Sequence, residues 1–179
     1  MIKKYMVPPK CIMVLATLML RCSDEPSLVE PVVNGGTLFI NEFMASNDTR
    51  YADENGDYDD WVEIYNGGPT AVDIGGYYLS DDHEIPLQIP ASTPELTTVD
   101  AGGFIVFWFD DTPDQGPLHI EYKLGANGDA IYLYDSDGVT ELDSHIFSSQ
   151  TTDISEGRTP DGGDNWEFFD SPTPGQPNI

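Results

Sequence analysis

The sequence predicts an all-β domain, an immunoglobulin-like β-sandwich, with an N-terminal signal segment and a short tether. Seventeen glycines and fourteen prolines among 179 residues indicate frequent turns. Runs of β-branched and aromatic residues recur every ~8–12 residues between turn signals, as in two-layer sandwiches. No run has the sustained period of a long helix.

The expected strands are short apolar runs bounded by Gly, Pro, Asn or Asp. They lie at residues 37–43, 61–66, 71–82 (two strands around a Gly-Gly break), 104–110, 130–135, 141–147 and 158–169. In the second strand Val62 and Ile64 share one face by alternation. The 104–110 run is apolar on both faces, as in a central strand that is covered twice. Asp135 to Gly138 is a hairpin signal, and 158–169 supplies a last turn and an edge strand.

The core must close without a disulfide, because Cys11 and Cys22 both lie ahead of the expected domain. Its members are expected to be apolar strand residues from both layers. They are Phe39, Val62, Ile64, Leu79, Phe104, Val106, Trp108, Ile131 and Leu133.

Residues 1–21 have the layout of a lipoprotein-type signal peptide. A basic stretch (1–10) precedes an apolar run (11–20). That run has about half of the ~20 residues that a membrane-spanning helix needs. Cys22 follows and is the expected lipidated first residue of the mature protein, with Arg21 standing where Gly, Ala or Ser is usual.

Residues 22–36 are polar and acidic and are expected to form a flexible tether ahead of a domain at 37–179. The acidic residues directly after Cys22 resemble a signal for surface display of lipoproteins. We therefore expect an exported outer-membrane lipoprotein that is exposed at the cell surface.

The net charge limits the class of partner. The formal charge is −25, from 7 basic and 32 acidic residues, and four of the basic residues precede residue 22. Without them the charge is 3 − 32 = −29. Such a surface repels phosphate backbones, so no nucleic-acid partner is expected. Cations, basic proteins and neutral glycans remain as classes of partner that such a surface can bind.

The densest acidic segment is DENGDYDD (53–60), directly before Trp61. Oxygen ligands at Asp53, Asn55, Asp57 and Asp59 would suit an irregular calcium site, since Ca²⁺ accepts 6–8 oxygens from flexible loops. The spacing is not that of an EF-hand. The alternative is an exposed loop with an Asn-Gly-Asp turn that leads into a buried strand.

Five segments, in this order, resemble the lamin-tail domain in its bacterial secreted form. They are INEFMASN (40–47), DWVEIYN (60–66), VDIGGYYLSD (72–81), GRTPDG (157–162) and PTPGQPN (172–178). The resemblance implies an immunoglobulin-like sandwich used for attachment or interaction, without catalytic residues of its own. The structural signature residues are Glu42, Asp60, Trp61, Glu63 and Asn66.

Glu63 has two interpretations. It lies on a strand between Trp61 and Tyr65 and so faces the outer side of a sheet. It is either solvated there, or buried beside Glu42 and held by loop backbone amides or by Arg158, because a buried carboxylate must be hydrogen-bonded or paired.

Three functions are compatible with the sequence. The first is a non-catalytic cell-surface module that binds a protein or another envelope partner. The second is a carbohydrate-binding accessory lipoprotein, which needs an exposed aromatic platform from residues such as Tyr132 and Tyr134. The third, a metal-dependent hydrolase, needs convergent carboxylates. His119 and His145 stand outside any nucleophile motif. The first function, the non-catalytic cell-surface module, is favoured. No cofactor is expected apart from the calcium of the acidic segment.

Overall fold

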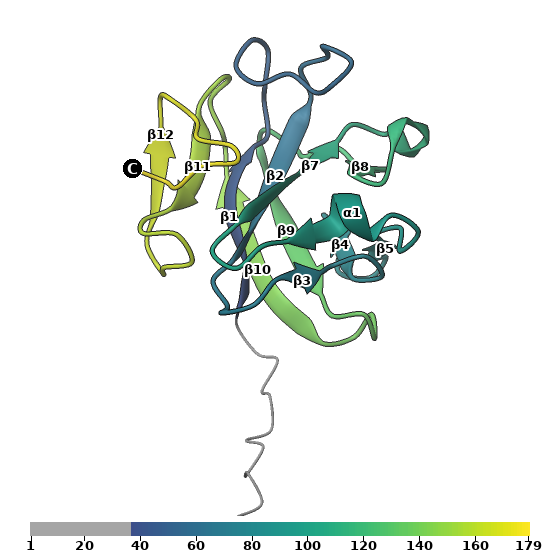
Figure 1. Ribbon diagram of the computed structural model, residues 1–179. Helices are drawn as coiled ribbons and strands as arrows, with labels where there is room; N and C mark the ends of the chain where they lie inside the picture. Colours follow the sequence, from purple (N-terminus) through teal and green to yellow (C-terminus); the bar gives the residue numbers. More distant parts are fainter. Residues whose placement is uncertain (1–36) are drawn as a thin grey trace, which may run out of the picture. The chain divides into compact units, whose positions relative to one another are not determined.

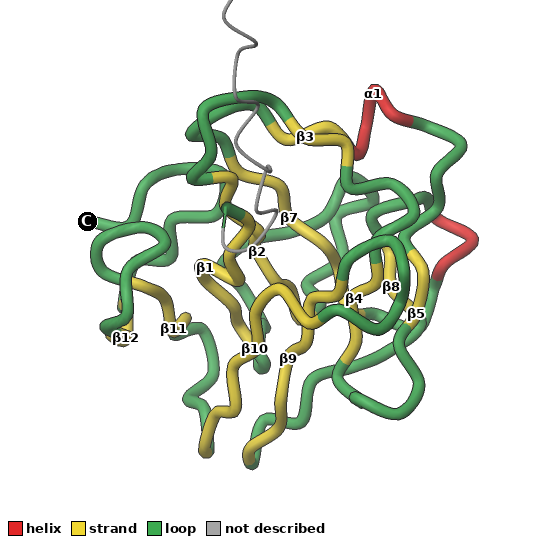
Figure 2. The backbone as a smooth tube through the Cα atoms, turned by 90° about the horizontal axis from the view of Figure 1, so that it is seen from below, coloured by secondary structure: helices red, strands yellow, loops and turns green. Residues whose placement is uncertain are grey.

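The computed structural model describes residues 37–179, so the signal segment, Cys22 and the tether lie outside the described residues. Within 37–179 the all-β prediction is confirmed (Figures 1 and 2). Helical structure in this range is limited to α1 (Pro94–Thr97) and a 3-10 turn, η1 (Pro113–Gln115). In the described part of the chain, neither helix has the length or hydrophobicity to cross a membrane.

The larger sheet has six strands. Their spatial order is β12 (Trp166–Phe169), β11 (Ser155–Arg158), β1 (Leu38–Met44), β2 (Asp60–Asn66), β7 (Phe104–Phe109) and β8 (His119–Ile120). Neighbours are antiparallel, except that β8 runs parallel to β7. The predicted edge strand in 158–169 is β12, at one end of this sheet.

The smaller sheet has four strands, in the order β10 (Glu141–Ser148), β9 (Gly128–Tyr134), β4 (Tyr78–Ser80) and β5 (Leu87–Gln88). A two-stranded ribbon joins β3 (Val72–Asp73) to β6 (Thr98–Val99). The predicted hairpin connects β9 to β10. Its turn closes through the Asp135 N–H donating to the Thr140 carbonyl at 2.8 Å, and Gly138 takes a left-handed φ of 68° that favours glycine.

The core lies between the inner faces of the two sheets. Phe43 of β1 meets Phe147 of β10 with ring centroids 4.5 Å apart, which joins the sheets directly. Five of the predicted core residues are completely buried there, and they are Val62, Ile64, Leu79, Ile131 and Leu133.

The prediction that Phe104, Val106 and Trp108 of β7 belong to the core between the sheets is wrong. Ile105, Phe107 and Phe109 point into the core, whereas Phe104 and Val106 lie half-buried on the opposite side. A strand that is apolar on both faces carries no alternation to decide its orientation, and a shift of one residue exchanges the faces. Phe39 likewise lies on the outer side of the sheet, where its ring stacks on Tyr65.

A β-bulge in β1 decides which side Glu42 occupies. The register with β2 shifts between Ile40 and Glu42, so Asn41 is the extra residue. Plain alternation would turn Glu42 inward with Ile40. The bulge instead pairs Glu42 with Glu63 on the outer face of the larger sheet.

Candidate functional site

Two signature carboxylates meet on the outer face of the larger sheet. Glu42 and Glu63 are register partners on β1 and β2, and both side chains are completely buried. The interpretation of Glu63 as a solvated residue is therefore excluded by its burial.

The C-terminal segment 171–179 covers these carboxylates, and we call it the strap. The Thr173 backbone N–H donates to Glu42 at 3.1 Å and the Thr173 hydroxyl donates to it at 2.9 Å. The Gly175 N–H donates to Glu63 Oε2 at 2.6 Å. Each carboxylate thus accepts a hydrogen bond from a loop backbone amide, which is one of the two arrangements expected for a buried Glu63.

Asn41 links the strap to the rest of the network. Its side-chain amide donates to Glu63 Oε1 and to Asp161, both at 3.0 Å. The same Asp161 oxygen accepts the backbone N–H of Asn178 at 3.0 Å. The Asn178 side chain then donates to the carbonyls of Asn41 and Arg158 at 3.2 and 2.8 Å. Residues from four separate sequence segments therefore form one hydrogen-bonded unit.

Burial governs the protonation of this unit. It raises the pKa of Glu63 from 4.5 to about 8, against the opposing hydrogen bonds from Asn41 and Gly175. Nearby Glu42 and Asp161 raise it further by charge repulsion. Burial also raises the pKa of Glu42, in spite of its hydrogen bonds from Ser155 and Thr173.

Arg158 does not reach Glu63. Its guanidinium pairs with Asp143 of the smaller sheet at 2.9 Å and donates to the Ile40 carbonyl at 2.8 Å. The same group lies 4.7 Å from the centre of the Trp166 ring. Arg158 therefore ties the two sheets together, and the strap residues take the place beside Glu63.

Trp61 belongs to a second apolar cluster on the outer face, with Met44 and Trp108. Tyr51, from the loop between β1 and β2, stacks on Trp108 at 5.3 Å and meets Trp61 edge-on at 6.1 Å. Trp108 is thus buried in this cluster rather than in the predicted main core. The loop that carries the acidic segment folds back over the sheet through Tyr51.

The remaining signature residues anchor turns. Asp60 accepts the Leu124 N–H at 3.2 Å, and burial raises its pKa to about 6. The Asn66 side-chain amide donates to the carbonyls of Thr70 and Val99 at 2.8 and 3.0 Å. Both residues connect β2 to neighbouring loops.

The acidic segment is organised by Asp53. One carboxylate oxygen accepts the backbone N–H groups of Asn55 and Asp57, both at 2.8 Å, which closes a tight turn. Asn55 and Asp57 are exposed and Asp59 is half-buried. Within residues 37–179, the carboxylates of Asp53, Asp57 and Asp59 do not gather as one group of metal ligands.

A different set of ligand-type side chains gathers around Asp53. Asp53, Asp110 and His119 are all buried, and one potential ligand atom from each lies within 4.8 Å of the other two. His119 Nδ1 is 2.6 Å from Asp110 Oδ2, and its Nε2 is 3.2 Å from Glu54 Oε1. Burial lowers the pKa of His119, but its hydrogen bonds to Asp110 and Glu54 outweigh burial and raise it overall.

Asp110 and His119 were not predicted from the sequence as partners of Asp53. The available signal was a histidine between two apolar residues, Leu118 and Ile120, which is typical of a buried side chain. Only the parallel pairing of β8 with β7, with His119 opposite Trp108, brings it beside Asp110.

On the larger sheet, the outward-facing aromatic rings pack as contacts between neighbouring strands. Tyr65 stacks on Phe104 at 5.0 Å, so each ring covers one face of its neighbour, whereas sugar stacking requires an exposed face. Phe39 stacks next to them, and Gly162 lies so close that an added Cβ would meet the Phe39 ring at 3.0 Å. Tyr132 and Tyr134 stack at 6.2 Å on the smaller sheet.

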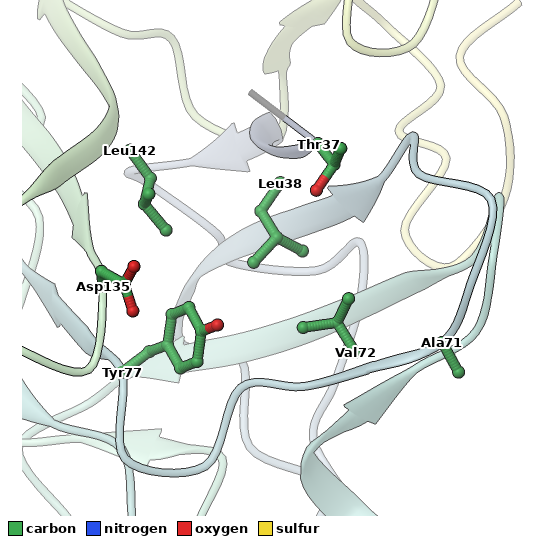
Figure 3. Close-up of a pocket in the computed structure, with 7 residues that line it drawn as sticks. All are labelled: Thr37, Leu38, Ala71, Val72, Tyr77, Asp135 and Leu142. Atoms are coloured by element: carbon green, nitrogen blue, oxygen red, sulfur yellow. The ribbon is translucent and has the colours of Figure 1, made fainter. Parts of the chain in front are cut away.

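A pocket of ≈ 250 Å³ is lined by seven residues, which Figure 3 draws as sticks. Four of its seven lining residues are aliphatic, Thr37 and Tyr77 add hydroxyl groups, and Asp135 is the single carboxylate. This pocket therefore lacks the convergent carboxylates that a metal-dependent hydrolase needs, and the ligand-type side chains that do converge are those of Asp53, Asp110 and His119.

The two-sheet architecture, with the signature carboxylates buried under the strap on the outer face of the larger sheet, defines an immunoglobulin-like module. The chain belongs to the Lamin Tail Domain family, whose family model matches residues 31–148. The family's domain is typically a non-catalytic interaction module. The match ends before the strap, although the strap packs on family residues of β1 and β2. No curated protein matches the chain.

Proposed function

We propose that this protein is a non-catalytic interaction module, anchored by a lipid on Cys22 and displayed on the outer face of the outer membrane. There it binds a protein or another component of the cell envelope. The observation that carries the proposal is the engagement of Glu42 and Glu63, the signature carboxylates, in hydrogen bonds that hold the strap. Both carboxylates stabilise the fold, so we assign the binding function to the exposed surface of the domain.

The charge of that surface supports a basic partner. Residues 37–179 hold three basic residues and 29 of the 32 acidic ones, a formal charge of 3 − 29 = −26. Arg158 is already paired with Asp143. A positively charged face is steered to such a surface and is released as salt screens the attraction.

The anchor is tested by palmitate labelling in the native host. Wild type and Cys11→Ala are expected to incorporate label, because Cys11 lies within the signal segment. Cys22→Ala is expected to incorporate none and to leave the membrane fraction. Equal labelling of the two cysteine variants would refute lipidation at Cys22.

The partner is tested by cross-linked capture from the protein's own envelope, with an unrelated acidic domain of similar charge as control. We expect a component that is retained by this chain alone and released between 0.15 and 1 M salt, where the Debye length falls from about 8 to about 3 Å. Equal retention by the control would show that charge alone is responsible and would refute a specific partner.

A further inference from the structure

We propose that Asp53, Asp110 and His119 form a binding site for a transition-metal dication of the zinc class. The site lies beyond the interaction function proposed above and does not depend on it. It also differs from the calcium loop expected from the sequence, with which it shares only Asp53.

The fold brings the three residues together from distant segments. Asp53 lies in the loop before β2, Asp110 directly follows β7, and His119 begins β8. Their side chains are set by the surrounding structure rather than by solvent, since the residues are 8%, 4% and 3% exposed. Asp53 is further fixed by the backbone amides of its own turn.

The spacing is close to that of a metal centre. Two ligand atoms bound to one tetrahedral zinc ion at about 2.1 Å lie about 3.4 Å apart. The three potential ligand atoms already lie within 4.8 Å of one another. The ligand atoms therefore have to approach one another by up to about 1.4 Å to close on an ion, a movement that side-chain rotation can supply.

Glu54 completes the surroundings. Its carboxylate is 3.2 Å from His119 Nε2, and its side chain is 62% exposed. An open hollow of ≈ 510 Å³, lined by Glu54, Asp53 and Trp108 among others, lies beside it. The two imidazole nitrogens point in different directions, with Asp110 at Nδ1 and Glu54 at Nε2. Glu54 can thus act as the second-shell partner of the imidazole, at a position that solvent and ions reach.

The negative charge of the carboxylates around His119 favours the binding of a cation. Among residues 37–179, neither Asp53 nor Asp110 forms an ion pair with a lysine or arginine. Asp110 pairs with His119 at 2.6 Å, and Asp53 accepts the backbone amides of its own turn. With Glu54, three carboxylates still surround a single imidazole, and a dication offsets this excess of negative charge. One imidazole nitrogen with two carboxylate oxygens suits zinc, cobalt or nickel, whereas calcium takes oxygen ligands.

The test is calorimetric titration of the full chain in detergent with Zn²⁺, Co²⁺ and, in parallel, Ca²⁺. We expect one zinc or cobalt ion per chain and no comparable calcium binding. His119→Gln is expected to weaken zinc binding at least about tenfold. His83→Gln is the matched control, because His83 is an exposed histidine with carboxylates of Asp82 and Glu84 at 4.0 Å, and it should bind as wild type does.

A second measurement keeps the test independent of the folding of the His119 variant. In nitrogen-15 spectra of the wild-type imidazoles, Zn²⁺ should shift the signals of one histidine only, and that signal should persist in His83→Gln. Zinc binding that is lost in His83→Gln, unchanged in His119→Gln, or matched by calcium would overturn the proposal.

Discussion

Raising the pH from 5 to 9 should destabilise the domain through Glu63. Its folded pKa of about 8 stands above the value of 4.5 expected without burial, so the folded state holds the proton more tightly. Stability from this group is therefore complete below pH 4.5 and is lost as the pH rises through 8. A difference of 3.5 pKa units corresponds to at most about 5 kcal/mol of unfolding free energy.

Glu63→Gln isolates this contribution, because glutamine has the same shape and does not ionise. Its NH₂ replaces one of the two oxygens that accept from Asn41 and Gly175. The lost hydrogen bond should cost roughly 1–3 kcal/mol at pH 5. At pH 9 the variant should equal or exceed wild type, so the two stability curves cross.

The assay is urea unfolding followed by tryptophan fluorescence at pH 5, 6, 7, 8 and 9, with Trp61 and Trp108 as buried reporters. Glu167→Gln, at an exposed position on β12, should keep the wild-type pH dependence. The reasoning is refuted if Glu63→Gln falls with pH as steeply as wild type, or if wild type gains stability between pH 6 and 9.

Three further predictions use the same urea assay. Deleting residues 171–179 removes the amide donors to two buried carboxylates and should cost roughly 3–5 kcal/mol, and a loss below about 1 kcal/mol would mean that the strap is dispensable. Trp61→Ala should cost about 3–5 kcal/mol by opening a cavity in the outer cluster, and a neutral effect would contradict its complete burial. Arg158→Met should cost about 3–5 kcal/mol by leaving Asp143 unpaired. Adding Asp143→Asn should recover part of that loss, and full additivity of the two changes would contradict the pairing.

Much of the architecture was predictable because it is encoded locally. The alternation in 61–66 correctly turned Val62 and Ile64 inward, and the turn residues at 135–138 correctly located the β9–β10 hairpin. The family was recognisable from short motifs in their order along the chain. These features depend on neighbours within a few residues, which a sequence displays directly.

The candidate sites were predictable only in part. Backbone amides beside Glu63 were one of two open alternatives, and its burial decided between them. The acidic segment suggested four ligands in one loop, whereas the structure uses Asp53 to close a turn. Its nearest ligand-type partners, Asp110 and His119, come from other strands.

The sequence by itself thus determined the longer strands, the β9–β10 turn and the family, since each is a property of a short segment. The short strands β5, β6 and β8, and β11 as a strand separate from β12, were not predicted. Tertiary structure alone decided the inward face of β7, the outward turn of Glu42 at the Asn41 bulge, and the meeting of Asp53 with His119. These outcomes depend on strand register and on pairings across tens of residues. A one-residue change of register reverses every side chain of a strand while leaving its composition the same.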